Sequence, residues 1–183
     1  MPESTFPHWS NIHTLVFDFD GVFTDNKVIV DQYGNESVIC DRGDGLAFDL
    51  LRHFVHEWKW PLKYFILSKE KNPVVSARAR KLKVDCIQGV DNKSRYLDEY
   101  SKKYFSDTLN PFKGIVYFGN DLNDLPAMQL VGFSVAPADA HPIVRRYANV
   151  TMPQYGGSGF IRASIEKILM IDQSKIDDII EIF

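Results

Sequence analysis

Two aspartates with one residue between them, Asp18 and Asp20, directly follow the apolar segment Thr14–Phe17. Apolar residues on successive positions are typical of a parallel strand that helices cover on both faces. Alternate side chains of an extended chain point the same way, so both carboxylates lie on one side at the end of that strand, where open α/β sheets bind ligands. Gly21 then allows the chain to turn sharply.

A carboxylate pair of this kind suits group transfer in two displacements. One carboxylate attacks as the nucleophile, while the second protonates the leaving oxygen and later deprotonates the attacking water. A bound cation would keep Asp18 ionised, whereas crowding among acids would favour a protonated Asp20. A simple turn is the alternative for a lone Asp-x-Asp-Gly. A calcium loop counted from Asp18 is disfavoured, because Val22 and Ile29 stand where it needs oxygen ligands.

A second acidic segment, residues 119–124, follows the apolar run Ile115–Phe118 and opens a helix. Acidic ends of two neighbouring strands can share one hard cation, and Mg²⁺ prefers few carboxylates together with water and substrate oxygens. We therefore expect Mg²⁺ to be bound by the side chains of Asp18 and Asp121 and by the backbone carbonyl of Asp20.

The other polar residues of this segment have two interpretations. Asp124 would not bind the metal itself but would orient its waters or ligands through hydrogen bonds. Capping of the following helix by Asn123 or Asp124 fits the sequence equally well, and both roles can hold together.

Two further strand ends carry residues that could serve a phosphate. Ser68 follows the apolar residues 64–67, and its hydroxyl could donate to a phosphate oxygen, although a serine at a strand end is more often a cap or turn residue. Lys93 precedes another helix, where its charge could balance the phosphate, although a lone lysine is normally a solvated surface residue. Along the chain the order is nucleophile, hydroxyl, lysine and acidic pair.

Short apolar runs that alternate with helical periodicity would position these residues. Strands are predicted over residues 14–17, 64–67, 115–118 and 133–135, with weaker candidates at 86–87 and 150–152. Helices are predicted over residues 46–55, 73–82, 96–104, 124–130, 141–147 and 158–169. For the second helix, Asn72 is the expected N-cap and Pro73 the first helical residue. The alternation predicts a doubly wound α/β fold in a single domain over residues 1–183.

One segment breaks this alternation. Residues 28–30 and 37–39 are predicted strands on either side of a turn that contains Gly34. They read as a β-hairpin placed directly after the first strand.

Composition restricts the function further. The 183 residues suit one domain with a substantial core, and the net charge of −3 favours neither nucleic acid nor an anionic membrane surface as a partner. Residues 1–11 lack the apolar stretch of a signal peptide, and no apolar run reaches the length that spans a bilayer. Cys40 and Cys86 form no metal or redox motif, so we interpret them as reduced core thiols of a cytoplasmic protein.

The order of the four polar segments resembles the haloacid dehalogenase superfamily of phosphatases. Its motifs match residues 18–21, Ser68, Lys93 and residues 119–124, so the resemblance covers nearly the whole chain. It implies a Rossmann-like sheet, a phosphoric monoester hydrolase, Mg²⁺ as cofactor and an aspartyl-phosphate intermediate on Asp18. Larger members insert a cap domain after the first motif or between the second and third. Here only the hairpin occupies the first place and the second has no room for a domain, which implies a hairpin flap and no cap domain.

Further segments resemble the capless branch of octulosonate 8-phosphate phosphatases. They are residues 41–45, 137–142 and 156–162. Members of this branch act on small phosphates of sugars that occur in lipopolysaccharide. They are typically tetramers in which a neighbouring subunit closes the open site. The resemblance therefore implies a homotetramer, with substrate contacts from Thr24, Arg42 and Asn123.

Residues 68–71 and 80–85 resemble the nonulosonate 9-phosphate phosphatases, which act on sialic-acid-type sugars. In those enzymes a glutamate just after the second motif and a lysine on the next helix help select the nine-carbon substrate, and the matching positions are Glu70 and Lys81. The other interpretation is a solvated helix face of alternating charge. Octulosonate enzymes usually carry arginine in place of Glu70, so the resemblance favours nine carbons over eight.

Three positions depart from the family pattern. Lys69 replaces the usual glycine after the second-motif hydroxyl, which alters how the backbone approaches a phosphate. Asn120 stands where many relatives have aspartate, which removes one possible metal carboxylate. Ser158 stands where arginine is common, which removes a candidate contact to the acid group of a sugar acid.

Two other functions compete with a phosphatase. One is a non-catalytic, oligomerising partner of a sialic acid cytidylyltransferase, since similar domains occur fused to such enzymes; the intact Asp18, Asp20, Lys93 and Asp121 argue against it. The other is a phosphomutase or phosphotransferase, which would have to exclude water from the aspartyl-phosphate. A chain without a cap is poorly built for that.

Overall fold

The central sheet has six parallel strands in the order β5-β4-β1-β6-β7-β8. The computed structural model describes residues 5–174 and 179–182. The strands are β1 (Thr14–Phe17), β4 (Lys63–Leu67), β5 (Asp85–Ile87), β6 (Ile115–Phe118), β7 (Phe133–Ala136) and β8 (Val150–Thr151). Each predicted strand of the sheet is therefore confirmed to within one residue at either end.

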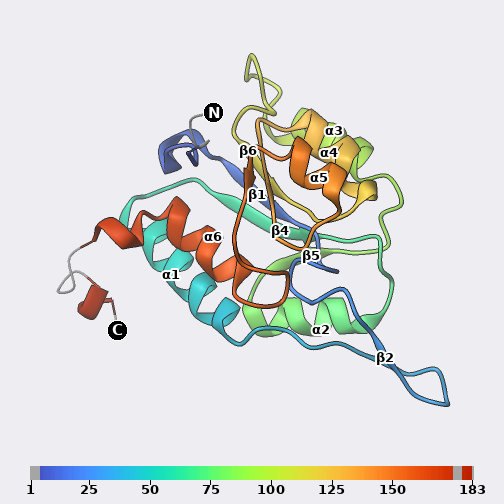
Figure 1. Ribbon diagram of the computed structural model, residues 1–183. Coiled ribbons are helices and arrows are strands. Elements are labelled where there is room, and N and C mark those ends of the chain that lie inside the picture. Colours follow the sequence, from blue (N-terminus) through green and yellow to red (C-terminus); the bar gives the residue numbers. More distant parts are fainter. Residues whose placement is uncertain (1–4, 175–178, 183) are drawn as a thin grey trace.

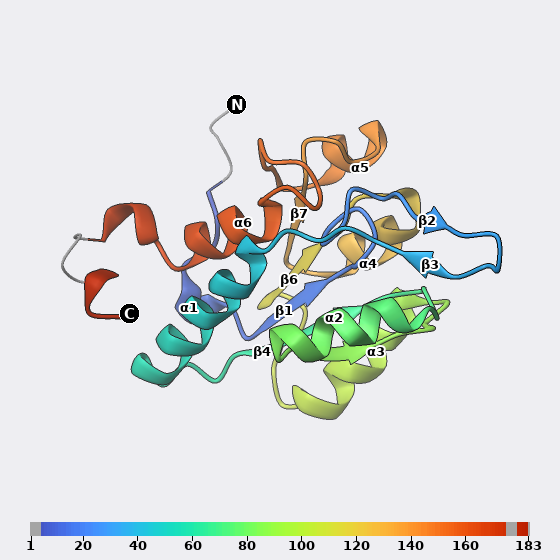
Figure 2. The same ribbon diagram turned by 90° about the horizontal axis from the view of Figure 1, so that it is seen from below.

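Helices cover both faces of this sheet, as the doubly wound fold requires (Figure 1). One face carries α1 (Gly43–Glu57), α2 (Pro73–Leu82) and α6 (Phe160–Ile168), and this face is turned towards the viewer in Figure 2. The other face carries α3 (Lys93–Tyr104), α4 (Leu125–Leu130) and α5 (Pro142–Tyr147). Short 3₁₀ turns stand at Trp9–Asn11, Leu122–Asp124 and Ile171–Gln173. Among the described residues, no helix is both long and apolar enough to cross a membrane.

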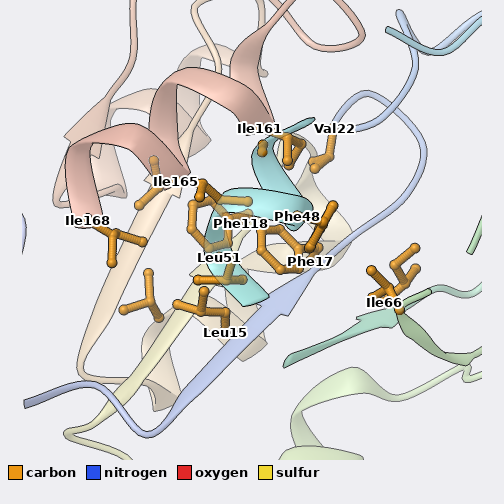
Figure 3. Close-up of a cluster of buried hydrophobic side chains, with 14 of the residues drawn as sticks. Leu15, Phe17, Val22, Phe48, Leu51, Ile66, Phe118, Ile161, Ile165 and Ile168 are labelled. Carbon is orange, nitrogen blue, oxygen red and sulfur yellow. The ribbon is translucent and has the colours of Figure 1, made fainter. Parts of the chain in front are cut away.

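Alternation along β1 divides the core into two clusters. Leu15 and Phe17 pack on the side of α1 and α6, where Phe17 stacks on Phe118 with ring centroids 4.5 Å apart (Figure 3). Val16 points to the opposite face and packs with Leu97 of α3. Every residue of β1 is buried, because helices exclude water from both sides of the strand.

Local signals set the helix boundaries. The predicted start of α2 is confirmed: the Asn72 side chain accepts a hydrogen bond from the Val74 amide, and Pro73 opens the helix. The predicted start of the last helix at Ser158 is two residues early. Gly159 has φ of +83°, a left-handed conformation that stops the helix from extending further towards its N-terminus.

The segment after β1 contains a smaller hairpin than the sequence suggested. Only β2 (Ile29–Val30) and β3 (Glu36–Ser37) pair, in antiparallel register. Residues 38–39 stay outside the pairing, because the turn begins at Asp31, whose Oδ1 accepts the amides of Tyr33 and Asn35. The hairpin projects from the body of the molecule in Figure 1, with five large apolar side chains on it or beside it exposed: Val28, Ile29, Val30, Tyr33 and Ile39.

Both cysteines are free and half-buried against the core that underlies α1 and α6.

One buried carboxylate stands at the start of α1. Asp44 is 1% exposed, and its nearest cation is the Arg78 guanidinium, with Nη2 to Oδ2 at 3.7 Å. Burial raises the pKa of Asp44 to about 7; the Arg78 charge opposes this shift and the Asp41 charge adds to it. Arg78 is held in place by a hydrogen bond of 2.6 Å from Nη2 to the Asp41 carbonyl.

The raised pKa of Asp44 predicts a pH dependence of stability. The folded state holds this proton more tightly than the unfolded state, so the contribution of Asp44 to stability is largest at low pH and is lost as the pH rises from about 4 to about 7. Asp44→Asn cannot ionise. We expect the free energy of unfolding of this variant, relative to that of the wild type, to increase by roughly 2–4 kcal/mol as the pH rises from about 4 to about 8. Urea unfolding at each pH measures this difference.

The control is Asp49→Asn, at an exposed position of the same helix. It should show no such gain. A constant difference between Asp44→Asn and wild type across the pH range would contradict the assignment of a protonated Asp44.

Candidate active site

The carboxyl ends of β1, β4 and β6 meet at one edge of the sheet. The register pairs Phe17 with Ile66 and with Phe118, so the residues that follow these strands emerge side by side. β1 lies where the strand order reverses, the usual place for a ligand in an open α/β sheet. A pocket of about 400 Å³ opens there, lined by Asp18, Asp20, Asn26, Ser68, Lys69, Glu70, Lys71, Asp91, Asn120, Asp121 and Asn123.

The turn after β1 fits closely against the end of β6. The Asp18 amide still donates to the Phe118 carbonyl at 2.9 Å, so the first aspartate is fixed by the sheet itself. Gly21 has φ of +74°, and a β-carbon there would lie 1.9 Å from the Asn120 side-chain nitrogen. Only glycine combines this conformation with this approach, which explains Gly21 within the Asp-x-Asp-Gly pattern.

Lys93 joins the two acidic strand ends. Its Nζ lies 2.7 Å from Asp18 Oδ1 and 2.7 Å from Asp124 Oδ1, and all three side chains are at most 7% exposed. Burial alone would lower the pKa of Lys93, but the charges of Asp18 and Asp124 outweigh it and raise the pKa. The lysine is therefore a fixed positive charge at the floor of the site.

Asp124 is saturated by donors and does not line the pocket. Its Oδ1 also accepts a hydrogen bond of 2.7 Å from the Tyr117 hydroxyl, and its Oδ2 accepts the amides of Asn120 and Asp121. Asp121 and Asp124 also form the capping box of the 3₁₀ turn Leu122–Asp124. Asp124 thus positions Lys93 and the loop that carries Asp121.

The two aspartates of the first motif have perturbed acidity. Burial and the Asp124 charge raise the pKa of Asp18 to about 7, while Lys93 opposes them. Burial, the Glu70 charge and, more weakly, the Glu36 charge raise the pKa of Asp20, again against Lys93. A protonated Asp20 could act as a general acid, and Asp18 needs a further positive charge nearby to be fully ionised at neutral pH.

Ser68 is presented with its proton available. Its Oγ accepts the Glu70 amide at 3.0 Å, which leaves the hydroxyl proton free to point into the pocket. The side chain is 1% exposed, so it belongs to the floor of the pocket rather than to its rim.

A loop far along the chain braces the turn that follows Asp18. The Gly157 amide donates to the Val22 carbonyl at 3.2 Å, and a β-carbon on Gly156 would lie 2.1 Å from the Gly21 carbonyl oxygen. Asp139 Oδ1 accepts the Gly156 amide at 3.0 Å and so holds this loop in place. Of the segments that the resemblance singled out, residues 156–162 thus contact this turn through their backbone, and residues 137–142 support them through the Asp139 side chain.

The donors at this site suit Mg²⁺ better than a metal that needs many protein ligands. Asp18 and Asp121 line the same pocket, and Asp20 lies beside them. In the described part of the chain, no group of three or more His, Cys, Asp or Glu side chains is arranged to hold a metal. Mg²⁺ does not need such a group, because it takes one or two carboxylates plus waters and substrate oxygens. Burial raises the pKa of Asp18 and of Asp20, and a bound cation would favour the ionised form of both carboxylates.

The predicted substrate contacts divide into two groups. Glu70 and Asn123 line the pocket. Thr24 does not: it is fully buried, and its Oγ1 accepts the amides of Gly21 and Asn26, so its role in this chain is structural. Arg42 at the start of α1 and Lys81 in the last turn of α2 are exposed and lie outside the residues that line the pocket.

Several residues of the site were not anticipated from the sequence. Lys71, Asn26 and Asp91 line the pocket, and Tyr117 binds Asp124. Tyr117 had one signal, since it is the only side chain with a polar group in β6. Asn26 had none, because its left-handed conformation, with φ of +62°, depends on the turn around Thr24.

Known proteins are similar to this chain over most of its length, and solved structures share its fold. No family model matches the chain. The 3-deoxy-D-manno-octulosonate 8-phosphate phosphatase KdsC of Escherichia coli (strain K12) is 28% identical over 173 residues, 92% of this chain and 84% of that protein. The 3-deoxy-D-manno-octulosonate 8-phosphate phosphatase of Moraxella catarrhalis, solved in complex with a magnesium ion, a phosphate ion and KDO, is 26% identical over 88% of both chains, with a TM-score of 0.76.

A solved structure with higher identity comes from Streptomyces avermitilis MA-4680 and is described as a HAD family hydrolase. It is 39% identical to this chain, covers 95% of both chains and has a TM-score of 0.82. The order of the motifs along the chain, the parallel sheet and this similarity over almost the full length agree. The protein belongs to the haloacid dehalogenase superfamily of hydrolases.

Proposed function

We propose that the protein is a magnesium-dependent phosphatase that hydrolyses the phosphate monoester of a nine- or eight-carbon sugar acid through an aspartyl-phosphate intermediate. The observation that carries this proposal is the contact of 2.7 Å between Lys93 Nζ and Asp18 Oδ1, in a pocket that also contains Asp20, Ser68 and Asp121. A buried carboxylate held at a fixed positive charge is placed to meet a phosphoryl group.

Asp18 is the proposed nucleophile and Asp20 the proposed general acid and base. An Asp18 oxygen attacks phosphorus and forms a new P–O bond, while the bond to the sugar oxygen breaks and Asp20 gives its proton to that oxygen. Asp20 then takes a proton from water, and the water oxygen attacks phosphorus. The bond to Asp18 breaks and inorganic phosphate leaves. The raised pKa of Asp20 supports its first role, because the group must start protonated.

Charge stabilisation comes from groups that are fixed before the substrate arrives. Lys93 is held by two carboxylates and does not have to move, and Ser68 can donate its hydroxyl proton to a phosphoryl oxygen. Mg²⁺, when bound by Asp18, Asp121 and the Asp20 carbonyl, supplies positive charge to the phosphoryl oxygens and keeps Asp18 ionised.

The size of the sugar is the finer part of the proposal. The similar enzymes from E. coli and M. catarrhalis are named for an eight-carbon sugar acid. Glu70 lines the pocket of this chain, which supports the nine-carbon alternative. Its Oε1 accepts the amides of Lys71 and Asn72, at 2.6 and 2.7 Å, so only Oε2 is open to a sugar.

We also propose a homotetramer that works in the cytoplasm. The exposed apolar side chains of the hairpin support self-association, with Tyr33 81% and Ile29 61% exposed. Arg42 and Lys81 lie outside the pocket of their own chain. In a tetramer they would contact a sugar that is bound in the pocket of a neighbouring subunit. The two free thiols suit a reducing compartment.

A panel of phosphate esters tests the proposed function. With Mg²⁺, we expect the purified protein to release phosphate from sialic acid 9-phosphate, its deaminated analogue or octulosonate 8-phosphate. Their kcat/KM should exceed that of p-nitrophenyl phosphate by at least about tenfold, since binding of the sugar contributes to the rate. EDTA should abolish release, and added Mg²⁺ should restore it.

Asp18→Asn, purified in the same way, controls for contaminating phosphatases. Absence of phosphate release from every sugar acid would overturn the proposal. It would favour the non-catalytic partner of a cytidylyltransferase instead.

A further inference from the structure

We propose that Lys69 and Lys71 form an anion subsite at the rim of the pocket, which binds the carboxylate of the sugar acid. The inference rests on the proposed function and adds to it the residues that recognise the acid group. The floor and the rim of the pocket differ in their exposure. Asp18, Ser68 and Asn120 at the floor are buried, whereas Lys69 and Lys71 are exposed.

The two rim lysines are cations without a partner in the described part of the chain. In residues 5–174 and 179–182, every ion pair closer than 4.0 Å uses a cation other than Lys69 or Lys71. The ammonium groups of these two lysines also make no hydrogen bond there. The floor lysine, Lys93, differs in this respect because two carboxylates already match its charge. The rim thus holds positive charge that neither the protein nor the phosphate position uses.

Acidic residues of the rim do not remove this charge. Glu70 lies between the two lysines in sequence, but its Oε1 accepts the backbone amides of Lys71 and Asn72, just before α2. In the part of the chain that the structure describes, these two amides, and not a lysine ammonium group, are the hydrogen-bond donors to Glu70. Asp91 also lines the pocket, yet neither rim lysine approaches it within ion-pair distance.

Hydrogen bonds anchor the backbone of the segment that carries the lysines. The carbonyl of Glu70 accepts the Gly89 amide at 3.0 Å, and the carbonyl of Lys71 accepts the Gln88 side chain at 2.9 Å. The stem of Lys71 lies along Gly89, where an added β-carbon would be 3.4 Å from Lys71 Cγ. Backbone that is already ordered loses little entropy when a ligand arrives.

A carboxylate is the anion that fits this arrangement and this substrate class. It has two oxygens and can accept from two ammonium groups at once. The phosphate of the same molecule belongs at the floor with Lys93, Ser68 and the metal ligands. A sugar acid with phosphate at one end and carboxylate at the other would bridge floor and rim, whereas a neutral sugar phosphate would leave the rim unused.

The test compares variants on a matched pair of substrates. The pair is the sugar acid phosphate that the wild type hydrolyses best and its analogue in which the carboxylate is reduced to an alcohol. We expect Lys69→Met and Lys71→Met each to raise KM for the acid about tenfold, and the double variant more, with kcat nearly unchanged. KM for the alcohol should not change. Lys113→Met is the control, because Lys113 is exposed and stands just before β6, at the opposite edge of the sheet.

Direct binding separates this inference from the proposed function. The phosphate-free sugar acid and its alcohol analogue are titrated into wild-type protein and the double variant, with NMR shifts of the protein as the readout. Binding of the acid that is lost in the double variant and kept in Lys113→Met supports the subsite whether or not the protein turns over. Equal affinity of wild type and double variant for the acid, or equal effects on acid and alcohol, would overturn it and show that both lysines are only solvated.

Discussion

Asp18→Asn is expected to lower kcat by at least about a thousandfold, because the amide cannot form the bond to phosphorus. The exchange keeps the shape of the side chain, and the Asp18 amide remains bonded to the Phe118 carbonyl. Rates of phosphate release under saturating Mg²⁺ measure the effect. In the wild type, acid quenching during turnover should trap phosphate on the peptide that contains Asp18.

The same variant should fold at least as well as the wild type at neutral pH. Burial raises the pKa of Asp18, so the ionised carboxylate is held in the metal-free fold against a desolvation penalty that asparagine does not have. Its folded-state pKa lies above the unfolded value, and the relative gain of the variant should therefore grow as the pH rises towards about 7. An unchanged melting temperature with wild-type kcat would remove the covalent role. If the variant does not fold, its loss of activity does not test the covalent role. The phosphorylated peptide of the wild type then provides the test.

Lys93→Met is expected to damage both stability and activity. The variant leaves the carboxylates of Asp18 and Asp124, 5% and 0% exposed, without their shared cation. Removal of one member of a buried ion pair typically destabilises a protein by about 3–5 kcal/mol. Loss of a preorganised charge at the phosphoryl group should lower kcat by about 10²–10³. Urea unfolding and phosphate release measure the two effects.

A lysine of the same helix provides the control for this variant. Lys102 is 73% exposed and pairs with Asp98 one helical turn away, so Lys102→Met should change stability by less than about 0.5 kcal/mol. The destabilisation of Lys93→Met should shrink as the pH falls, because the orphaned carboxylates can then take up protons. Lys93→Arg keeps the charge and should recover part of the stability. Similar losses for Lys93→Met and Lys102→Met would contradict the central role of Lys93.

The polar ends of the strands were predictable because they depend on short-range patterns. Asp18 and Asp20 follow a buried apolar run with a spacing of two, and residues 119–124 repeat that arrangement. Asn72 and Pro73 mark the start of α2 by local chemistry alone. Each of these signals is contained in a few consecutive residues, so one sequence is enough to recognise it.

The parts of the site that escaped prediction depend on contacts between distant segments. The Tyr117 hydroxyl is aimed at Asp124 only after β6 and the loop behind it have taken their places. The outward position of Lys81 follows from the length and rotation of α2, which a charge pattern does not reveal. The hairpin was predicted longer than it is, because apolar residues 38–39 resemble strand residues even where no partner strand reaches them.

The brace between Gly157 and the Val22 carbonyl has a consequence for how the enzyme is made. The turn that carries the nucleophile leaves the ribosome early, whereas the loop that closes over it is translated much later. Contacts so distant in sequence form late in folding, since the entropy of the intervening chain must be lost first. A growing chain would therefore already contain Asp18 before the loop that braces its turn has been translated. It would stay inactive until residues 156–157 dock on that turn.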